Sequence, residues 1–238
     1  MKTKNIIITG ASSGIGEASA RLLAAQGHRL LLIARRAGKL HQLANELGDV
    51  ASVCPVDVTN YVELQRAFAE VVLPWGEVDV LINNAGVGYF EKIENGNVNH
   101  WHQMIDVNVK GLLHCIHLSM PHLLKSNGLI VNVGSVASHQ VFANTGVYCA
   151  TKHAVWAISE SIRLELAGRV RVTTISPGSV NTPFIDNTTD TQMLNQYKDY
   201  FANAMPAKVV AEQIMHAVDC SPESVITEII VRPNRQVK

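Results

Sequence analysis

The sequence has few of the features that mark secreted, metal-stabilised and nucleic-acid-binding proteins. Its four cysteines are far apart and form no CxxC pair, so neither a disulfide framework nor a zinc ribbon is expected. Lysine and arginine together number 20, as do aspartate and glutamate, and this balance excludes an overall field that would attract nucleic acid or an anionic membrane. We therefore expect a cytoplasmic protein whose partners are small molecules.

Long apolar runs are also missing. The opening "MKTKNIIITG" stops after three isoleucines, too short for the core of a signal peptide, and no uncharged stretch is long enough to span a bilayer. The apolar residues, 47% of the 238, are instead spread along the chain and suffice for a sizeable core. A soluble protein without a membrane partner is expected.

Apolar runs of strand length alternate with segments of helical period. The candidate strands are residues 5–9, 29–34, 50–56, 78–82, 128–134, 170–176 and 224–231. Between them, apolar residues repeat at helical spacing, and residues 101–116 read as one helix. The alternation predicts a single α/β domain, residues 1–238, with a Rossmann-like, doubly wound sheet of about seven parallel strands and helices on both faces. Residues 181–205, rich in Asn, Thr and Asp, are expected to form a loop or lid.

A glycine-rich motif, "TGASSGIG" at residues 9–16, follows the first strand and opens the first helix. Glycine permits tight-turn dihedrals, and without a Cβ the backbone N–H groups can approach a pyrophosphate at the positive end of a helix. An ordinary turn with close helix packing explains an isolated glycine triplet equally well. No Gly-Lys-Ser/Thr follows, which argues against ATP or GTP.

The second strand ends in "LLLIARR". In dinucleotide folds, a carboxylate at this position suits the free 2′-hydroxyl of the adenosine ribose, whereas an arginine suits a 2′-phosphate. Arg35 and Arg36 therefore favour NADP over NAD, because two guanidinium groups can fork onto phosphate oxygens. Paired arginines also solvate strand ends, so NAD stays open.

Three further positions carry chemistry. "GLIVNVGSVAS" places Ser135 at the carboxyl end of the fifth strand, where open α/β sheets bind their ligands. In "YCATK", Tyr148 and Lys152 are four apart and share a helix face. An ammonium beside a phenol stabilises the tyrosinate and lowers a pKa that starts at about 10, giving a tunable proton donor and acceptor. Taken alone, the pair also fits an exposed tyrosine packed on a lysine stem.

Two asparagine motifs read as structural when taken singly. "NNAG", residues 83–86, follows the fourth strand and can tie that strand end to its neighbour through hydrogen bonds of the side-chain amides. Asn108 falls on the apolar stripe of residues 101–116, and a buried amide there needs partners.

Together, "TGASSGIG", "NNAG", Asn108, Ser135 and "YCATK" resemble the short-chain dehydrogenase/reductase family in residue type, order and spacing, over nearly the whole chain through "SPGSVNTP". The resemblance implies an oxidoreductase that interconverts a carbonyl and an alcohol. In it, Tyr148 would be the acid/base, Lys152 would lower the pKa of Tyr148 and hold the nicotinamide ribose, and Ser135 would orient the substrate. Asn108 would anchor a proton-relaying water chain.

The same resemblance implies a dimer or tetramer, with the Tyr148 helix and the final strand at interfaces, and a set of cofactor-binding residues. Ser13 stands where many NADP-preferring members carry a basic residue, so the NADP prediction depends on Arg35 and Arg36. The implied cofactor-binding residues are Gly10, Ser12, Ser13, Gly14, Ile15, Gly16, Arg35, Arg36, Asp57, Val58, Asn83, Ala85, Gly86, Tyr148, Lys152, Pro177, Gly178, Val180 and Thr182.

Three other functions fit parts of the sequence less well. A non-catalytic regulator that senses the NADP(H) ratio often lacks the tyrosine or the lysine, and both are present. His114, His117 and His122 lie close in sequence but have no nearby carboxylate or cysteine, so no metal site is expected. A serine hydrolase would need the G-x-S-x-G elbow, which "NVGSVAS" lacks.

The expected substrate pocket is built from three segments. These are "VGYFE" after Gly86, "VASHQVF" after Ser135, and the loop with Phe184, Tyr197 and Tyr200. Their mixed apolar and aromatic character favours neutral carbonyl compounds over phosphorylated or acidic ones. His139, Lys198 or Asp199 would change that preference by pointing inward.

Overall fold

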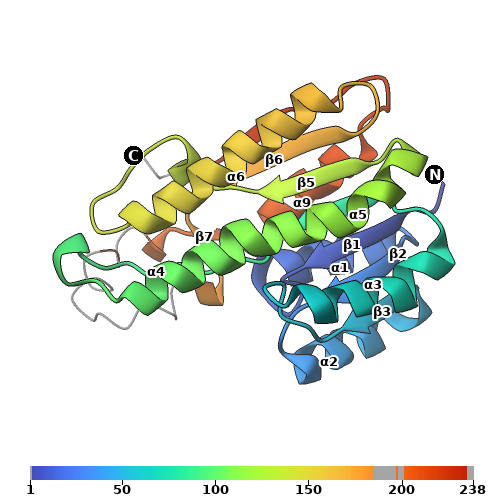
Figure 1. Cartoon of the computed structure of the whole chain (residues 1–238), viewed down its shortest axis with the longest axis horizontal. Helices are drawn as coiled ribbons and strands as arrows, with labels where there is room; N and C mark the ends of the chain where they lie inside the picture. Colours follow the sequence, from blue (N-terminus) through green and yellow to red (C-terminus); the bar gives the residue numbers. More distant parts are fainter. Residues whose placement is uncertain (1, 185–196, 198–200, 235–238) are drawn as a thin grey trace.

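The computed structural model describes residues 2–184, 197 and 201–234. Its main sheet has seven parallel strands in the order β3-β2-β1-β4-β5-β6-β9 (Figure 1). Each strand overlaps one of the predicted runs, and the predicted doubly wound fold is confirmed. The strands are β1 (Asn5–Thr9), β2 (Arg29–Ile33), β3 (Ala51–Cys54), β4 (Val80–Asn83), β5 (Leu129–Val133), β6 (Arg171–Pro177) and β9 (Glu228–Val231).

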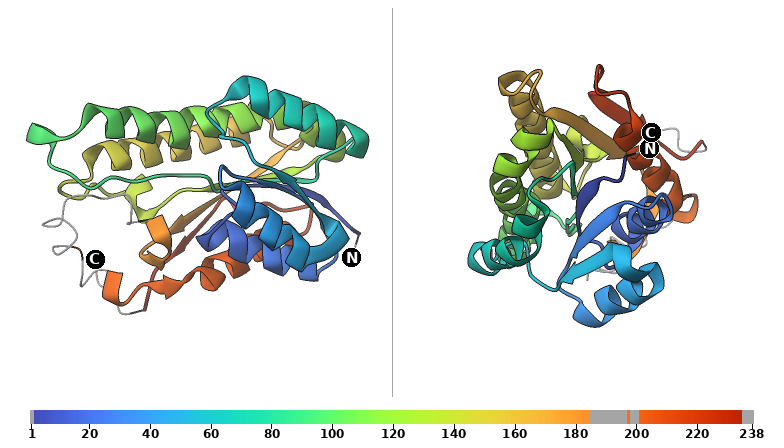
Figure 2. Two further views of the ribbon diagram at one scale, coloured as in Figure 1. Left: turned by 90° about the horizontal axis from the view of Figure 1, so that it is seen from below. Right: turned by 90° about the vertical axis from the view of Figure 1, so that its right-hand side faces the viewer.

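Helices cover the sheet on both sides, as the two views of Figure 2 show. Successive residues of a strand belong to two separate cores: Ile7 of β1 lies in one, and its neighbours Ile6 and Ile8 lie in the other. The first core includes residues of α3 (Tyr61–Trp75), α5 (Leu112–Ser126) and α6 (Gly146–Glu165). The second includes residues of α1 (Gly14–Ala25), α2 (Ala37–Leu47) and α9 (Ala207–Asp219). Because both faces are covered, the central strands are mostly apolar on both faces, with a few buried polar residues such as Asn132.

The strand order creates a crevice at the carboxyl end of β1. This strand lies between β2 and β4, so the chain leaves β1 toward α1 on one face, while the segment after β4 leads toward the helices of the other face. Open parallel sheets bind ligands where two such connections diverge. The fold therefore places the glycine-rich motif and the "NNAG" motif at the two sides of one opening.

The single helix predicted for residues 101–116 is interrupted in its hydrogen-bond register. The structure has α4 (Val98–Ile105), then a π-helical turn over Asp106–Gly111, and then α5. In Figure 1 this stretch runs as one long rod beside α6. The apolar period of residues 101–116 predicts one continuous helix and does not reveal the π turn. Such turns occur often at functional sites, and this one contains Asn108.

The predicted loop at residues 181–205 is described only at its ends, since residues 185–196 and 198–200 lie outside the described residues. Its two ends meet in a short parallel pair of strands, β7 (Val180–Asn181) and β8 (Met205–Pro206). Pro206 directly precedes α9 (Ala207–Asp219) as its N-cap residue. Within the described residues, no helix combines the length and the apolar character that a membrane span requires.

Candidate active site

A cavity of about 700 Å³ opens at the carboxyl ends of the strands. Eighteen of the predicted site residues line it, while Gly16, Asn83 and Asn108 do not. The lining also includes Asn84, which the sequence reasoning left out. The predicted residues in the lining are Gly10, Ser12, Ser13, Gly14, Ile15, Arg35, Arg36, Asp57, Val58, Ala85, Gly86, Ser135, Tyr148, Lys152, Pro177, Gly178, Val180 and Thr182.

The glycine-rich motif is packed directly against the segment after β4. Gly10 has a φ of +65°, and a Cβ on Gly16 would lie 2.4 Å from the carbonyl oxygen of Gly10. The Asn84 side chain fills the remaining space, where its amide donates to the carbonyl oxygens of Thr9 (3.0 Å) and Gly10 (3.2 Å). Gly16 therefore serves the site through close packing, and Asn84 fixes the turn on which a phosphate would rest.

The two arginines after β2 have different partners. The Arg36 guanidinium donates to the hydroxyl oxygens of Ser12 (2.8 and 3.0 Å) and Ser13 (2.5 Å) in the glycine loop. Arg35 instead lies 3.7 Å from a carboxylate oxygen of Asp57. Since hydroxyl groups are neutral, Arg36 keeps its full charge beside the N-terminus of α1, a combination that fits a phosphate.

Tyr148 and Lys152 project from successive turns of α6 toward the cavity. The Lys152 Nζ lies 5.9 Å from the centroid of the Tyr148 ring and donates to the carbonyl oxygen of Val133 at 2.8 Å. Lys152 is 6% exposed, and its burial lowers its pKa to about 8. The ammonium is thus still mostly protonated at neutral pH and is held at a fixed distance from the phenol.

Ser135 begins the short 3-10 helix Val136–Ser138 at the end of β5. Its hydroxyl accepts from the backbone N–H of Ala137 (3.1 Å) and donates to the carbonyl oxygen of Pro177 (3.5 Å). The Ser138 hydroxyl accepts from the Ser135 backbone N–H in return, so a capping box fixes the serine. This places a hydroxyl in the lining of the cavity that Tyr148 and Lys152 also line.

Asn108 connects the segment after β4 to α6 from below the cavity. Its side-chain amide donates to the Val87 carbonyl oxygen (2.9 Å) and to the Thr151 hydroxyl (3.0 Å), and its oxygen accepts from the Val87 N–H (2.8 Å). Thr151 precedes Lys152, and a Cβ on Gly86 would lie 3.8 Å from the Lys152 Nζ. Asn108 therefore does not line the cavity, but it contacts Val87, which does, and Thr151, which precedes Lys152.

The two asparagines of "NNAG" point in opposite directions, as successive residues at a strand end do. Asn84 faces the glycine loop, whereas the Asn83 amide donates to the Asn132 side chain at 2.9 Å. Asn132 in turn donates to the Ser159 hydroxyl of α6 at 2.8 Å. The side-chain amide hydrogen bonds expected of this motif are present, and they join β4, β5 and α6.

The three helix histidines contact local groups. His114 lies 2.9 Å from the Val58 carbonyl oxygen, His122 lies 3.2 Å from that of Gly76, and His117 contacts the ring of Tyr61. In the part of the chain that the structure describes, no group of three or more His, Cys, Asp or Glu side chains forms a candidate metal site.

Comparison with solved structures gives the same architecture. A closed form of serine dehydrogenase complexed with NADP+ is 32% identical with a TM-score of 0.89, over 95% of this chain and 94% of the other. An alcohol dehydrogenase from Thermococcus sibiricus complexed with 5-hydroxy-NADP is 28% identical with a TM-score of 0.89, over 100% and 99%. A short chain dehydrogenase/reductase from Burkholderia phymatum in complex with NAD is 27% identical with a TM-score of 0.87, over 96% and 89%. Proteins similar to this chain thus bind NADP-type cofactors and NAD.

Sequence comparison agrees. An uncharacterized oxidoreductase of Staphylococcus saprophyticus is 39% identical, with 99% of this chain and 98% of the relative covered. The sequence model described as short chain dehydrogenase matches residues 4–193. The chain therefore belongs to the short chain dehydrogenase family of oxidoreductases.

Proposed function

We propose that the protein is an NADP(H)-dependent oxidoreductase that interconverts a ketone or aldehyde and an alcohol by hydride transfer. The observation that carries this proposal is a cavity with two chemically different ends. Arg35, Arg36 and the glycine loop line one end, and Ser135, Tyr148 and Lys152 line the other. The similarity to a serine dehydrogenase and an alcohol dehydrogenase, each bound to an NADP-type cofactor, supports the same reaction class.

The residues present fit a dinucleotide with a 2′-phosphate. Arg36, held by the hydroxyls of Ser12 and Ser13, offers an uncompensated charge, and the backbone N–H groups that open α1 suit the pyrophosphate. Arg35 shares its charge with Asp57 and would contribute less. The adenine would be held at Asp57 and Val58, and the nicotinamide end at Pro177, Gly178, Val180 and Thr182.

The chain's own residues supply the proton chemistry. Bound at this site, the nicotinamide would supply or accept the hydride. In reduction, the Tyr148 hydroxyl donates a proton to the developing alkoxide while the Ser135 hydroxyl donates a hydrogen bond to the same oxygen, and oxidation reverses both. The Lys152 charge, 5.9 Å from the Tyr148 ring, favours the phenolate. A water chain anchored at Asn108 would exchange the proton with solvent through Lys152.

The decisive experiment is the Tyr148→Phe variant. It removes the phenolic proton but no phosphate contact, so turnover should fall below a few per cent of the wild-type rate while NADPH affinity stays within about twofold. Turnover is followed by NADPH absorbance, with NADH in parallel, on a panel of ketones, aldehydes, 3-hydroxy acids and sugars. A variant that retains more activity would overturn the role of Tyr148.

The cofactor preference has its own test. The double variant Arg35→Ala/Arg36→Ala should weaken NADPH binding far more than NADH binding, and Arg36→Ala alone should account for most of the loss. Equal losses for the two cofactors would reject the 2′-phosphate site. Binding of NADPH without turnover of any compound in the panel would favour the alternative, a non-catalytic NADP(H)-sensing regulator.

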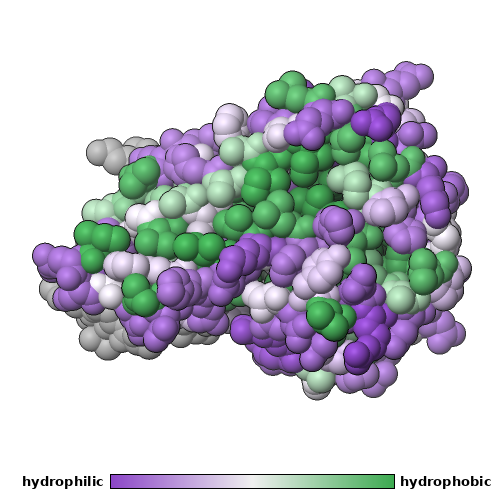
Figure 3. Space-filling model, viewed as in Figure 1, coloured by the Kyte–Doolittle hydropathy of each residue, from purple (hydrophilic) through white to green (hydrophobic). Residues whose placement is uncertain are grey.

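We also propose one dinucleotide-binding and catalytic domain over residues 1–238, with residues 181–205 as its substrate-binding loop, in a cytoplasmic homodimer or homotetramer. In Figure 3, apolar residues gather over α5 and α6. These two helices carry four exposed large apolar side chains, Leu113, Leu124, Trp156 and Leu164, which supports assembly through this face. Light scattering on the purified protein measures the oligomer.

A further inference from the structure

The substrate end of the cavity gathers most of the chain's phenylalanine. The sequence has five phenylalanines, and only Phe68 lies elsewhere, in the core beneath α3. The other four line the cavity together with Tyr197, although aromatic residues make up only 5% of the chain. They are Phe90, Phe142, Phe184 and Phe201. They reach the cavity from three separate segments of the chain, so this concentration is not a local run in the sequence.

Two of these rings lie beside the phenol of Tyr148, and two further aromatic rings pack against one of them. The ring centroids of Phe90 and Phe184 lie 6.1 and 5.4 Å from that of Tyr148. Phe90 also contacts Tyr197 at 5.1 Å and Phe201 at 6.3 Å. A carbonyl group that meets the Tyr148 hydroxyl must therefore place its substituents against aromatic walls, which favour apolar and aromatic groups.

Gly88 leaves space for the ring of Phe184. A Cβ on Gly88 would lie 2.3 Å from the tip of the Phe184 ring, so the ring lies directly on the Gly88 backbone. Gly88 does not have a positive φ, so close packing of the ring, and not the backbone conformation, accounts for glycine at this position. The Phe184 ring therefore packs closely against the backbone at Gly88.

Positive charge is scarce at this end of the cavity. The described charged residues in the lining are Arg35, Arg36 and Asp57 at the proposed adenosine end, and Lys152, which already donates to Val133. His139, which would alter the pocket by pointing inward, instead lies 2.6 Å from the Glu228 carboxylate and outside the lining.

Residues 185–196, which follow Phe184 in the sequence, carry no positive charge. Residues 185–196 contain two aspartates and no lysine or arginine, and Lys198 and Asp199 lie outside the described residues. Because Arg35 and Arg36 lie at the proposed adenosine end, a substrate carboxylate at the other end would find, among the described lining residues there, no guanidinium of the kind that recognises carboxylates.

We propose that the substrate is an uncharged carbonyl compound, or the corresponding alcohol, with an aromatic or bulky apolar substituent. This inference rests on the proposed function, because Tyr148 fixes where the carbonyl lies. It excludes amino acids, 3-hydroxy acids and phosphorylated sugars as preferred substrates.

Two matched pairs of compounds test the inference with wild-type protein and NADPH. Acetophenone against butanone isolates the aromatic ring, and ethyl acetoacetate against acetoacetate isolates the charge. The ring and the neutral ester should each raise kcat/KM at least about tenfold, and L-serine with NADP+ should be slower than 1-phenylethanol. Higher kcat/KM for butanone, acetoacetate or serine, with turnover still lost in Tyr148→Phe, would overturn the substrate class and leave the proposed function standing.

Matched leucine variants locate the effect. Phe90→Leu and Phe184→Leu should lower the acetophenone-to-butanone ratio at least about threefold, while Phe68→Leu, the same change in the core, should leave it unchanged. Gly88→Ala should shift the ratio as well, because the Phe184 ring must move. An unchanged ratio in both cavity variants would contradict the inference.

Binding measurements separate the two proposals. Dissociation constants of the four carbonyl compounds are measured by calorimetry on the NADPH complex of Tyr148→Phe, which needs no turnover. If wild-type protein turns over none of these compounds, yet the ring and the neutral ester still tighten binding, the proposed function fails while the preference of the cavity for uncharged, aromatic ligands stands. Equal binding within each pair would contradict the substrate class.

Discussion

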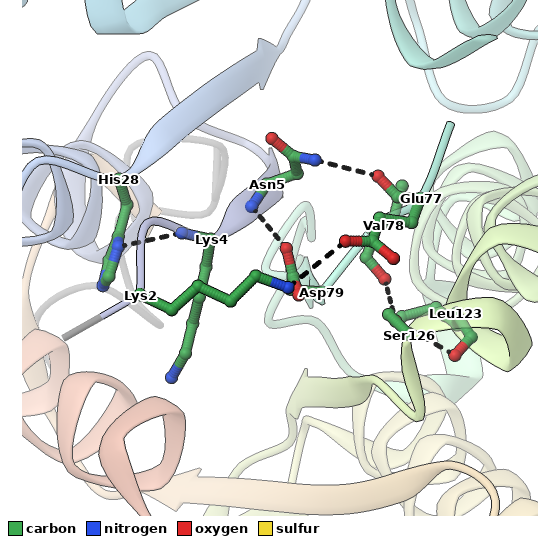
Figure 4. Close-up of polar contacts among 9 residues, drawn as sticks. All are labelled: Lys2, Lys4, Asn5, His28, Glu77, Val78, Asp79, Leu123 and Ser126. Atoms are coloured by element: carbon green, nitrogen blue, oxygen red, sulfur yellow. Dashed lines mark hydrogen bonds and ion pairs between the residues drawn. The ribbon is translucent and has the colours of Figure 1, made fainter. Parts of the chain in front are cut away.

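The two ends of the parallel sheet use their polar groups in opposite ways. At the amino end, shown in Figure 4, the polar groups bind one another: the Asn5 N–H donates to an Asp79 carboxylate oxygen at 2.7 Å, and the Ser126 hydroxyl donates to the Val78 carbonyl oxygen at 2.6 Å. At the carboxyl end, the glycine loop and Asn84 pack the connections after β1 and β4 against each other, and beside them Tyr148 and Lys152 project from α6 toward the cavity. One end is closed by its own contacts, and the other is kept open for a ligand.

The difference has an energetic meaning. Buried polar groups that find partners stabilise a fold, whereas a buried charge kept for chemistry destabilises it. We therefore expect substitutions of the side chains kept for chemistry at the carboxyl end to change activity with little loss of stability, and substitutions of the polar groups at the amino end to do the reverse. Gly16, where two connections pack against each other, should affect both binding and stability.

Lys152→Met should lower kcat/KM by at least about a hundredfold, because the charge beside Tyr148 is lost. The same variant should be more stable at pH 7, on the order of 1–2 kcal/mol, since burial lowers the pKa of Lys152 to about 8 and so destabilises its charged form. Wild-type stability should rise as the pH increases from 8 to 10.5, where the unfolded state binds the extra proton, and the variant should lack this rise.

The control for this variant is Lys110→Met, which removes an exposed lysine paired with Asp106 on the π turn. It should leave both activity and stability nearly unchanged. Urea unfolding at several pH values, together with steady-state kinetics, provides the measurements. A less stable Lys152→Met protein at pH 7 would show that the buried ammonium supports the fold, contrary to the comparison.

Gly16→Ala should weaken NADPH binding at least tenfold and lower the free energy of unfolding by about 1–3 kcal/mol, because its Cβ would lie 2.4 Å from the Gly10 carbonyl oxygen. The matched change is Gly38→Ala in α2, where nothing lies within 4 Å of the added methyl group. This variant should gain up to about 1 kcal/mol and bind NADPH normally. Similar behaviour of the two variants would show that close packing is not what position 16 requires.

Asp79→Ala should lower the free energy of unfolding by about 1.5–3 kcal/mol, because the Asn5 N–H loses a charged acceptor, while kcat and KM stay at wild-type values. Glu77→Gln is the control at the same end: its 3.4 Å contact with Lys2 is exposed and should contribute less than about 0.5 kcal/mol. A loss of activity in Asp79→Ala at a temperature where it remains folded would break the separation of the two ends.

Much of the fold follows from the sequence because both faces of the sheet are covered, so the buried strands are apolar runs. The strand ends do not follow as well. Residues 50–56 were predicted as a strand, but β3 pairs with β2 only as far as Cys54 because β2 itself ends at Ile33. Similarly, β9 begins at Glu228, opposite Thr174, rather than at residue 224. The length of a strand depends on how far its partner strand extends. The sequence of the strand itself does not contain this information.

The candidate site, like the fold, can be predicted from the sequence only in part. Glycines, Ser135, Tyr148 and Lys152 stand out because each suits its chemistry by residue type and position in an element. The motif "NNAG" alone does not indicate that Asn84, and not Asn83, faces the glycine loop. The alternation of side chains along a strand does show that the two asparagines point apart. The gathering of phenylalanines from three segments depends on tertiary contacts, so the sequence suggested a mixed apolar pocket without indicating how strongly aromatic it is.

His28 gives the smallest expected effect and tests the amino end by pH. It is 1% exposed, its Nδ1 accepts from the Lys4 N–H at 3.3 Å, and its Nε2 has no partner among the described residues. Burial, with the nearby Lys4 charge, lowers its pKa below the usual 6.5, against weaker opposing effects of Asp219 and Asp79. The folded state then binds fewer protons than the unfolded state, so stability is full above pH 6.5 and falls below it, by less than about 1.4 kcal/mol per pH unit.

His28→Gln should flatten this acid slope, because glutamine keeps an acceptor for the Lys4 N–H but does not titrate. His41→Gln, the same change at an exposed position on α2, should keep the wild-type slope. Unfolding free energies from urea titrations at pH 5, 6, 7 and 8 give the comparison. If the two variants share one slope, the acid sensitivity lies elsewhere. The amino end would then owe its stability to the hydrogen bonds of Figure 4 without a contribution from a buried neutral imidazole.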